Sequence, residues 1–328
     1  MGVALLQRAG AHDGLDQRCM LIGMRILVVG AGATGGWFGA KTALAGRDVT
    51  FLVRPGRAAV LRERGLRLTG SDDETLVPQV VTADAPGGHY DAVLVAVKAL
   101  ALAPAIDDLA PAVGPETAVV PFLNGMAHVD TLRARFGDRV LGGVVKISST
   151  IGPDGEIVRF GPLASLAVGE LDGSVTPRVK ELVATFDGAG FDVAQPPSIL
   201  AAMWHKWVLI ATMGALNCLA RGTVGEIVAQ PGGALLGPAL LAEAAAVSAA
   251  AGFPVPPEEL AATTQTITRP GSPFAASMYR DVTGGLPTEV EQILGDLVAR
   301  AAALGVEVPL LDLATLQLRV QQQRVLGA

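Results

Sequence analysis

The chain has 328 residues, two cysteines and a formal net charge of −6. A chain of this length usually forms two cores, and since half of its residues are hydrophobic it does not need disulfides to fold. The acidic balance has the wrong sign for binding nucleic-acid phosphates or an anionic membrane surface. The sparse cysteines and the lack of a secretory leader predict a cytoplasmic protein, and no uncharged run is long enough to predict a membrane-spanning helix. The sequence has no cluster of Cys and His or of paired Asp, so we expect no metal.

Residues 1–24 precede the first strong structural signal, and we interpret them as an N-terminal arm. Arg25–Gly30 then has the continuous apolar character of a strand in a parallel sheet that is covered on both faces. Ala33–Leu44 has the composition of a helix, and Asp48–Val53 is a second apolar strand. The first predicted unit is therefore βαβ.

The alternation continues beyond this unit. Asp91–Val97 and Thr117–Phe122 are predicted strands with a helix over Ala99–Leu109 between them, so the sheet is expected to extend across residues 25 to 147. From Val140 a Pro-Asp-Gly turn between β-rich stretches predicts an antiparallel hairpin at one edge.

A helix over Thr176–Asp187 and a strand over Phe191–Ala194 are expected to close the first domain, which we place at residues 25–196. The remainder, residues 197–328, consists of helix-length windows separated by Pro and Gly. The predicted fold is α/β, a doubly wound parallel sheet followed by a mainly α-helical C-terminal domain.

A glycine-rich turn follows the first strand directly. Residues 30–35 read Gly-Ala-Gly-Ala-Thr-Gly and fit the GxGxxG pattern at the start of a helix. Glycines in this context allow a tight turn, close approach of a pyrophosphate and close packing of the helix, whose N–H groups face the anion. The pattern predicts a Rossmann-type dinucleotide site in the first domain.

The end of the second strand indicates which dinucleotide binds. NAD-preferring sites usually carry Asp or Glu there, whereas this chain has Arg54. An arginine can pair with a 2′-phosphate, so we predict NADPH as the cofactor. The alternative is that Arg54 is a solvated loop charge.

The chain uses lysine sparingly, with five lysines against 20 arginines. Lys98 follows a strand at the sheet edge where such folds bind ligands, although it could simply mark the end of the strand in solvent. Lys206 lies among apolar residues, with Met203 and Ile210 on the same helical face. Burial there would lower its pKa and make it a useful acid, unless its stem lies along apolar surface with the ammonium in water.

Several short motifs in one order resemble the ketopantoate reductase (2-dehydropantoate 2-reductase) family, and the resemblance covers nearly everything after Met24. These motifs are GAGATG, the Arg54 position, LVAVKAL with Lys98, LNGM with Asn124, MWHKW with Lys206, SMYRD with Ser277, and PTEVEQILG with Glu289. The resemblance implies a Rossmann domain and a helical domain with NADPH and substrate in the cleft between them.

The resemblance also implies a role for each matched residue. Lys206 and Glu289 would be catalytic, with Lys206 donating a proton to the carbonyl oxygen and also contacting substrate, and Ser277 would bind substrate. The cofactor would be held by Gly30, Gly32, Ala33, Thr34, Gly35, Arg54, Lys98, Asn124, Ser149 and Glu289. The implied reaction is NADPH-dependent reduction of a 2-oxo acid to a 2-hydroxy acid.

The substrate pocket departs from the family pattern. Positions that are usually polar carry Ile210, Gly214, Val224 and Phe274. Asn217 and Arg221 are candidates to replace the lost groups, and we count Asn217 among the expected substrate-binding residues. Fewer amides would favour a less polar carbonyl substrate as an alternative.

A further alternative, from another class, is a non-catalytic NADP-sensing protein. In either case we expect a small-molecule partner and neither nucleic acid nor membrane. The Ala-rich helical domain makes a homodimer plausible, and we call it the substrate and dimerisation domain.

Overall fold

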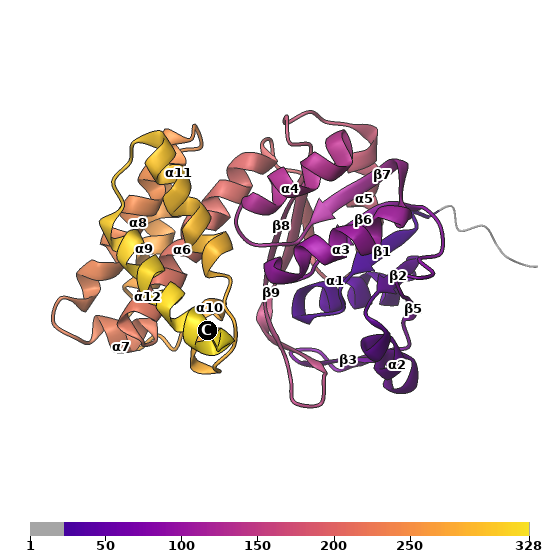
Figure 1. The fold of residues 1–328 in the computed structure, drawn as a ribbon, viewed down its shortest axis with the longest axis horizontal. Helices are drawn as coiled ribbons and strands as arrows, with labels where there is room; N and C mark the ends of the chain where they lie inside the picture. The colour runs from indigo at the N-terminus through magenta and orange to yellow at the C-terminus, as the bar shows by residue number, and fades with distance from the viewer. Residues whose placement is uncertain (1–22, 328) are drawn as a thin grey trace, which may run out of the picture.

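The computed structural model describes residues 23–327. The expected arm, residues 1–24, lies outside the described residues except for Gly23 and Met24. All the strands lie in the N-terminal part of the described chain, which forms an α/β domain, and only helices follow β10 (Asp192–Ala194). Figure 1 shows the two parts side by side, with the helical part on the left. The predicted fold class is confirmed.

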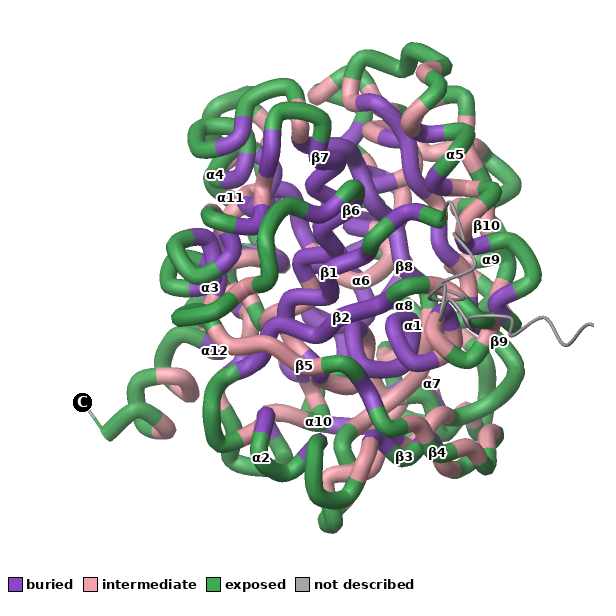
Figure 2. Tube along the Cα trace, turned by 90° about the vertical axis from the view of Figure 1, so that its right-hand side faces the viewer, coloured by how far each residue is buried: buried purple, intermediate pink, exposed green. Residues whose placement is uncertain are grey.

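The first sheet has the order β5-β2-β1-β6-β7, and all its strands are parallel. Its central strands are almost completely buried, as Figure 2 shows, which explains their continuous apolar sequence. The predicted helix over Ala33–Leu44 is α1, and the predicted strands are confirmed within a few residues. The strands are β1 (Ile26–Val29), β2 (Val49–Leu52), β5 (Gln79–Val81), β6 (Tyr90–Val95) and β7 (Val113–Pro121).

The predicted hairpin forms, but its place at the edge of the first sheet is wrong. β8 (Gly142–Ile151) and β9 (Ile157–Gly169) pair antiparallel, and β9 also pairs in parallel with β3 (Leu66–Gly70) and β10. Only a single bridge between Val119 and Val140 connects the hairpin to β7. The hairpin lies in a second sheet because β9 finds partners on both sides, and the parallel sheet ends at β7 rather than at residue 147.

Helix α1 lies between the two sheets, and its glycines explain how it fits there. A Cβ at Gly39 would lie 2.7 Å from the Phe51 ring of the first sheet, and one at Gly36 would lie 2.5 Å from the Ile157 side chain of the second. Trp37 and Phe38 are fully buried on this helix. The glycines therefore allow both sheets to approach one helix closely.

Other elements of the α/β domain were expected in part or not at all. The predicted helix over residues 99–109 is a short 3₁₀ turn, Ala99–Ala101, followed by α3 (Leu102–Leu109), and the helix expected over Thr176–Asp187 is α5 (Pro177–Phe186). Elements without a sequence prediction are α2 (Pro55–Arg64), β3, β4 (Glu74–Leu76), β5 and α4 (Ala127–Phe136). They are short or carry few apolar residues, which weakens a periodic signal.

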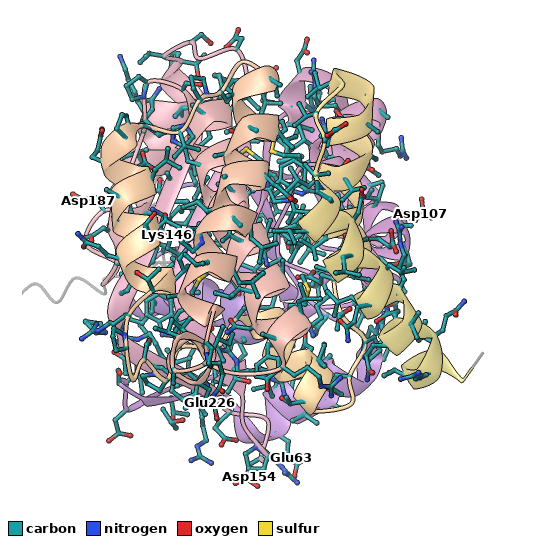
Figure 3. All side chains as sticks on the ribbon, turned by 90° about the vertical axis from the view of Figure 1, so that its left-hand side faces the viewer. Glu63, Asp107, Lys146, Asp154, Asp187 and Glu226 are labelled. Carbon is teal, nitrogen blue, oxygen red and sulfur yellow. The ribbon has the colours of Figure 1, made fainter. Side chains whose placement is uncertain are left out.

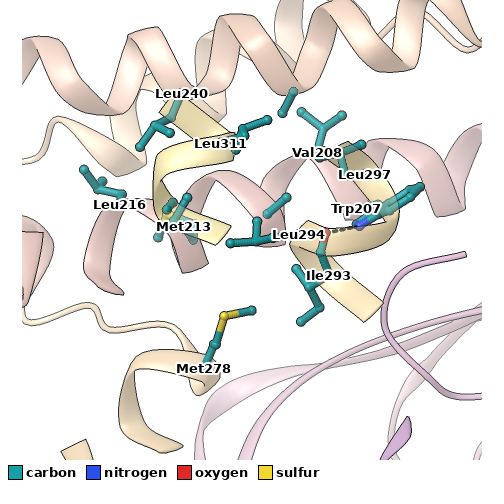
Figure 4. Packing of buried hydrophobic residues seen from close by; sticks show 14 of the residues in the cluster. Trp207, Val208, Met213, Leu216, Leu240, Met278, Ile293, Leu294, Leu297 and Leu311 are labelled. Carbon is teal, nitrogen blue, oxygen red and sulfur yellow. Dashed lines mark hydrogen bonds between the residues drawn. The ribbon is translucent and has the colours of Figure 1, made fainter. Parts of the chain in front are cut away.

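The C-terminal domain is built around α6 (Ile199–Ala220). Ser198 caps this helix by accepting a hydrogen bond from the Ala201 N–H at 3.2 Å. Figure 4 shows the apolar residues that pack around α6, with Met213 and Leu216 near Leu240 and Leu311 of the neighbouring helices. The other elements are α7 (Val224–Val228), α8 (Gly233–Ala250), α9 (Pro257–Ile267), α10 (Ser277–Thr283), a π-helical turn η4 (Glu291–Gly295), α11 (Asp296–Leu304) and α12 (Pro309–Leu326).

By length and composition alone, α6 and α8 are apolar enough to cross a membrane. In the fold α6 is the central helix of the domain core, where 61% of its apolar window is buried. Its apolar sequence is thus accounted for by packing inside the protein.

Candidate active site

The expected cofactor residues lie beside β1, where the chain adds β2 on one side of the sheet and β6 and β7 on the other. β1 lies between β2 and β6, so the loops after β1 and β6 leave in opposite directions and open a crevice at the carboxyl edge of the sheet. Gly30 follows β1, Lys98 follows β6 and Asn124 follows β7. The parallel topology therefore brings these residues to one edge.

The glycine turn has the geometry that its sequence predicts. Gly30 has a φ of +98°, and a Cβ at Gly35 would lie 2.4 Å from the Ala96 Cβ and 2.6 Å from the Gly30 carbonyl oxygen. Gly32 is the N-cap of α1 and supplies no side-chain cap, so the first N–H groups of the helix, at Ala33 and Thr34, are free to face an anion. Ser149 comes to the same place from β8, because its hydroxyl donates to the Ala33 carbonyl at 3.2 Å.

Arg54 is exposed at the end of β2, where it directly precedes α2. Pro55 starts that helix, and its fixed φ sets the direction in which the chain leaves the sheet. The guanidinium thus lies at the rim of the carboxyl edge, within the same group of loops as the glycine turn.

Two contacts of the loop after β6 cross from the α/β domain to the helical domain. The Lys98 ammonium pairs with the Asp281 carboxylate of α10 at 3.3 Å. The neighbouring Ala99 N–H donates to Oε1 of Glu289 at 3.1 Å. The predicted cofactor edge is therefore in direct contact with the helical domain.

Glu289 accepts hydrogen bonds from both loops at this edge. Its Oε2 accepts from Nδ2 of Asn124 at 3.4 Å, while its Oε1 accepts from Ala99. Thr288 beside it is fixed by a 2.8 Å hydrogen bond from its N–H to the Gln322 side chain of α12. Glu289 is thus a partly buried carboxylate held between the two domains.

Lys206 lies on α6 near this carboxylate, and its ammonium is poorly solvated. Its pKa falls from 10.5 to about 8, mainly because of burial and also because of the positive charge of Lys146, although the negative charge of Glu289 acts to raise it. Charged side chains elsewhere, such as Glu63, Asp154 and Asp187, lie at the outline of the molecule (Figure 3). Lys206 is therefore an acid of unusual strength for a lysine, close to a carboxylate.

The residue next to Lys206 fixes α6 against the segment that carries Glu289. Nε1 of Trp207 donates to the Ile293 carbonyl at 2.8 Å, the contact drawn as a dashed line in Figure 4. Ile293 belongs to the π-helical turn η4, which begins two residues after Glu289. Single π turns occur often at functional sites because they shift side chains relative to the surrounding helix.

The expected substrate residues Ser277 and Asn217 differ in their exposure to solvent. Ser277 is exposed at the first position of α10, one turn before Asp281, and so lies on the same helix face as the carboxylate that meets Lys98. Asn217 is fully buried: its Nδ2 donates to the Gly222 carbonyl at 2.8 Å and its Oδ1 accepts from the Ala276 N–H at 2.9 Å. The expectation that Asn217 supplies an amide to substrate is corrected, because this side chain holds the end of α6 to the loop before α10.

The four altered positions have different environments. Val224 is fully buried, whereas Phe274 is 44% exposed. A Cβ at Gly214 would meet the Met278 side chain at 3.4 Å, which is ordinary contact, so the helix could carry a small side chain there. Ile210, one turn after Lys206, is only partly buried. The face of α6 one and two turns after Lys206, which we call the apolar wall, therefore carries Ile210 and Gly214.

His128, which the sequence did not single out, lies in the first turn of α4 and is 4% exposed. Burial and the charge of Lys206 together lower its pKa to about 3, while a backbone hydrogen bond at Asn124 acts to raise it. Its place four residues after Asn124 is the only signal in the sequence that could have indicated it.

A cavity of about 590 Å³ lies on the other side of α6. It is lined by Leu200 and Trp204, and Trp204 is two residues, or about 200°, away from Lys206 around the helix. Neither Lys206 nor Glu289 lines this cavity.

Comparison with known proteins identifies the family. The model of the ketopantoate reductase PanE/ApbA family matches residues 26–173, and the model of its C-terminal domain matches residues 198–322. The chain belongs to the ketopantoate reductase family. It is 32% identical over 291 residues to YkpB, an uncharacterized oxidoreductase of Bacillus subtilis, covering 88% of this chain and 96% of that one.

Two solved structures share the fold over nearly the whole chain. A 2-dehydropantoate 2-reductase from Geobacter metallireducens is 28% identical and superposes with a TM-score of 0.83 over 90% of this chain and 99% of that one. A D-mandelate dehydrogenase in a ternary complex with NADH and anilino(oxo)acetate is 20% identical, with a TM-score of 0.83 over 92% and 99% of the two chains. The chain is thus an oxidoreductase-family protein whose glycine turn has the open backbone and free helix N–H groups that a nicotinamide dinucleotide requires.

The buried ammonium has a measurable effect on stability. In Lys206→Met the buried charge is absent, so we expect the variant to be more stable than the wild type at pH 7. The folded-state pKa of Lys206 is lower than its unfolded value, so the unfolded chain binds the extra proton between pH 8 and 10.5. The wild type should therefore gain about 3 kcal/mol relative to the variant as pH rises through this window.

Urea unfolding of both proteins at intervals from pH 7 to pH 10.5 measures this difference, and Lys180→Met on α5 is the exposed control. A wild-type-to-variant difference that stays constant with pH would show that the Lys206 ammonium is solvated.

Proposed function

We propose that this protein uses NADPH to reduce a 2-oxo acid to a 2-hydroxy acid, and that Lys206 donates the proton. The observation that carries the proposal is the position of Lys206. A lysine whose pKa burial has lowered to about 8 lies beside a carboxylate that is itself hydrogen-bonded to the cofactor edge of a Rossmann sheet.

Bound NADPH would supply the hydride, and the residues of this chain would do the rest. The Lys206 ammonium would donate its proton to the carbonyl oxygen as negative charge develops there. The carboxylate of Glu289 favours the charged form of Lys206. Hydrogen bonds from Asn124 and the Ala99 N–H keep that carboxylate at a fixed distance from the sheet edge. Ser277 is proposed to contact the substrate from α10. The free N–H groups at Ala33 and Thr34 would hold the pyrophosphate.

Binding alone does not require a poorly solvated lysine, which costs folding free energy. This argues for an enzyme over the alternative of a non-catalytic NADP sensor. A sensor would retain the glycine turn and Arg54, but it would gain nothing from the charge at Lys206.

Within this reaction we propose a substrate less polar than ketopantoate as the second candidate. Ile210 and Gly214 line the helix after Lys206, so the wall offers no amide there to a substrate hydroxyl. Sites that read a hydroxyl do so through such hydrogen bonds, and an apolar wall instead favours a branched or aromatic side chain. A D-mandelate dehydrogenase with the same fold is consistent with a less polar substrate, since that protein's ligand carries an aromatic ring.

The first experiment follows NADPH oxidation with ketopantoate and a panel of branched and aryl 2-oxo acids that lack its hydroxyl. We expect turnover of at least one, with a less polar acid favoured if the apolar wall governs specificity. Lys206→Ala should lose about 100-fold or more in kcat, because the proton donor is gone, while Lys180→Ala on the exposed face of α5 should be unchanged.

Tight NADPH binding with no turnover of any acid would support the sensor instead. A clear preference for ketopantoate would show that the polar positions lost from the pocket are not needed to recognise its hydroxyl.

The choice of NADPH over NADH rests on Arg54. Because this guanidinium lies at the end of β2 and no acidic side chain occupies the position, Arg54→Ala should weaken NADPH binding by about 10-fold and leave NADH binding nearly unchanged. Arg62→Ala, further along α2, is the matched control. Equal effects on both nucleotides, measured by fluorescence titration, would reject the assignment.

We further propose that the protein is a cytoplasmic homodimer whose helical domain, residues 197–328, makes the interface, while residues 25–196 bind the cofactor. Leu313, Leu316 and Val320 lie at i, i+3 and i+7 on α12 and are 52%, 60% and 41% exposed. An apolar stripe of this kind usually packs against a partner.

Sedimentation velocity at micromolar concentration tests the dimer. We expect a dimer for the wild type and a monomer for Leu316→Glu, because the substitution places a charge in the apolar stripe. Glu63→Ala on α2 is the control. A monomeric wild type would contradict this part of the proposal.

A further inference from the structure

The cavity of about 590 Å³ beside Trp204, which we call the interdomain cavity, is lined by both domains. Helix α4 and Leu171, which follows β9, line it from the α/β domain, and α6, α11 and the end of α8 line it from the helical domain. Arg300 of α11 and Asp130 of α4 both line it and pair at 3.1 Å, and Figure 2 shows these two helices close together. Its volume and its place between two domains are typical of a small-molecule site.

The buried part of the lining is apolar and partly aromatic. Met126 and Val129 at the start of α4 are buried, and Trp204 of α6 is only 3% exposed. The rings of Trp204 and Phe253 stack with an angle of 16° between their planes and 6.0 Å between their centroids. A surface of this kind binds a branched or aromatic hydrocarbon group.

Four charged side chains also line the interdomain cavity, and two of them compensate each other. The guanidinium of Arg300 donates to Asp296 and to Asp130, each at 3.1 Å. It also lies over the rings of Trp204 and Trp207, at 6.0 and 5.7 Å from their centroids. Arg300 and Asp130 therefore leave no uncompensated charge for a ligand.

The other two charged residues of the lining, Arg133 and Asp172, have opposite signs and do not pair. The Arg133 guanidinium is exposed on α4 and makes no hydrogen bond or ion pair with any described residue. The Asp172 carboxylate accepts the Ser174 N–H at 2.9 Å, which is a neutral partner. Arg178, whose charge also acts on Asp172, is already paired with Glu170 at 2.6 Å. One cation and one anion at this cavity thus remain free to bind a ligand.

We propose that the interdomain cavity binds a zwitterionic amino acid with a branched or aromatic side chain. Arg133 binds its carboxylate, Asp172 binds its ammonium, and its side chain lies against Trp204 and Phe253. A single exposed charge binds weakly because water competes for it, whereas two opposite charges matched by one ligand add specificity to an apolar contact. The inference goes beyond the proposed reaction and does not rest on it.

A ligand that carries both charges fits this lining better than a ligand that carries one. A carboxylate without an amine is attracted by Arg133 and repelled by Asp172, and an amine without a carboxylate meets the reverse. A neutral hydrocarbon leaves both side chains without a partner.

Isothermal titration calorimetry with L-phenylalanine tests the site. The comparison ligands are 3-phenylpropionate and 2-phenylethylamine, each of which lacks one of the two charged groups, and L-serine, which lacks the apolar side chain. We expect saturable binding of one L-phenylalanine per chain. Each comparison ligand should bind about 10-fold more weakly or not at all, because it loses a charged hydrogen bond or the apolar contact.

Two substitutions test the charged residues separately. Asp172→Asn keeps the acceptor for Ser174 but removes the charge, so it should weaken L-phenylalanine by about 10-fold and strengthen 3-phenylpropionate by about 3-fold. Arg133→Gln should weaken both ligands by about 10-fold. Arg135→Gln, on the same helix but outside the lining, is the matched control. All three residues are exposed, so thermal unfolding should match the wild type.

A third pair of variants tests the place of binding. Ala303 is exposed on α11 and lines the interdomain cavity, so Ala303→Trp should fill it and abolish binding. Ala302→Trp, beside it but outside this lining, is the matched control and should bind like the wild type. Lys206→Met changes the proposed catalytic cleft and should leave the binding of L-phenylalanine unchanged.

The outcomes distinguish this inference from the proposed reaction. A wild-type protein that shows no saturable binding of L-phenylalanine overturns the inference. Binding that Arg133→Gln and Asp172→Asn leave unchanged, or that Lys206→Met abolishes, overturns it too, because the ligand then lies elsewhere. The titrations need neither dinucleotide nor turnover, so the expected pattern of binding in a protein that reduces no 2-oxo acid supports the inference while rejecting the reaction.

Discussion

The site depends on one electrostatic constraint, which is that a positive charge on α6 must be kept in a poorly solvated place. Burial makes the charged form of Lys206 unfavourable, and Glu289 partly compensates for this. Glu289 can compensate for burial only while its carboxylate is held at a set distance from the amine.

The fold meets this requirement from both sides. Asn124 and the Ala99 N–H fix the carboxylate from the α/β domain, and the bond from Trp207 to Ile293 fixes the helix that carries the amine to the segment that carries the carboxylate. The same loops follow β6 and β7 of the sheet against which α1 packs. The glycines of α1 thus matter twice, at Gly35 for the dinucleotide turn and its close contact with Ala96 after β6, and at Gly36 and Gly39 for close contact with the two sheets.

Much of this arrangement could be predicted from the sequence where local signals are strong. The apolar strands and the GxGxxG turn have patterns that depend on neighbouring residues, and α1 was predicted with its observed bounds. Lys206 stood out because a lysine among apolar residues in a lysine-poor chain is unusual. The location of the hairpin was not predictable, because nothing near Val140 records that β9 would pair with the distant β3 and β10. Asn217 and His128 were misjudged or missed for a related reason: whether a polar side chain is free or bonded to a distant backbone group is decided only by the tertiary fold.

The π-helical turn at Glu291–Gly295 accommodates one extra residue at the start of the helix that continues as α11. It holds one more residue per turn than an α-helix, and its Ile293 carbonyl is bound from outside by Trp207. If one residue were deleted here, the i→i+5 bonds of the turn would become i→i+4 bonds, and the residues on either side would keep their orientation. The change would be confined to the turn itself, so homologous chains with an ordinary α-helix here should align with this one through a gap of a single residue.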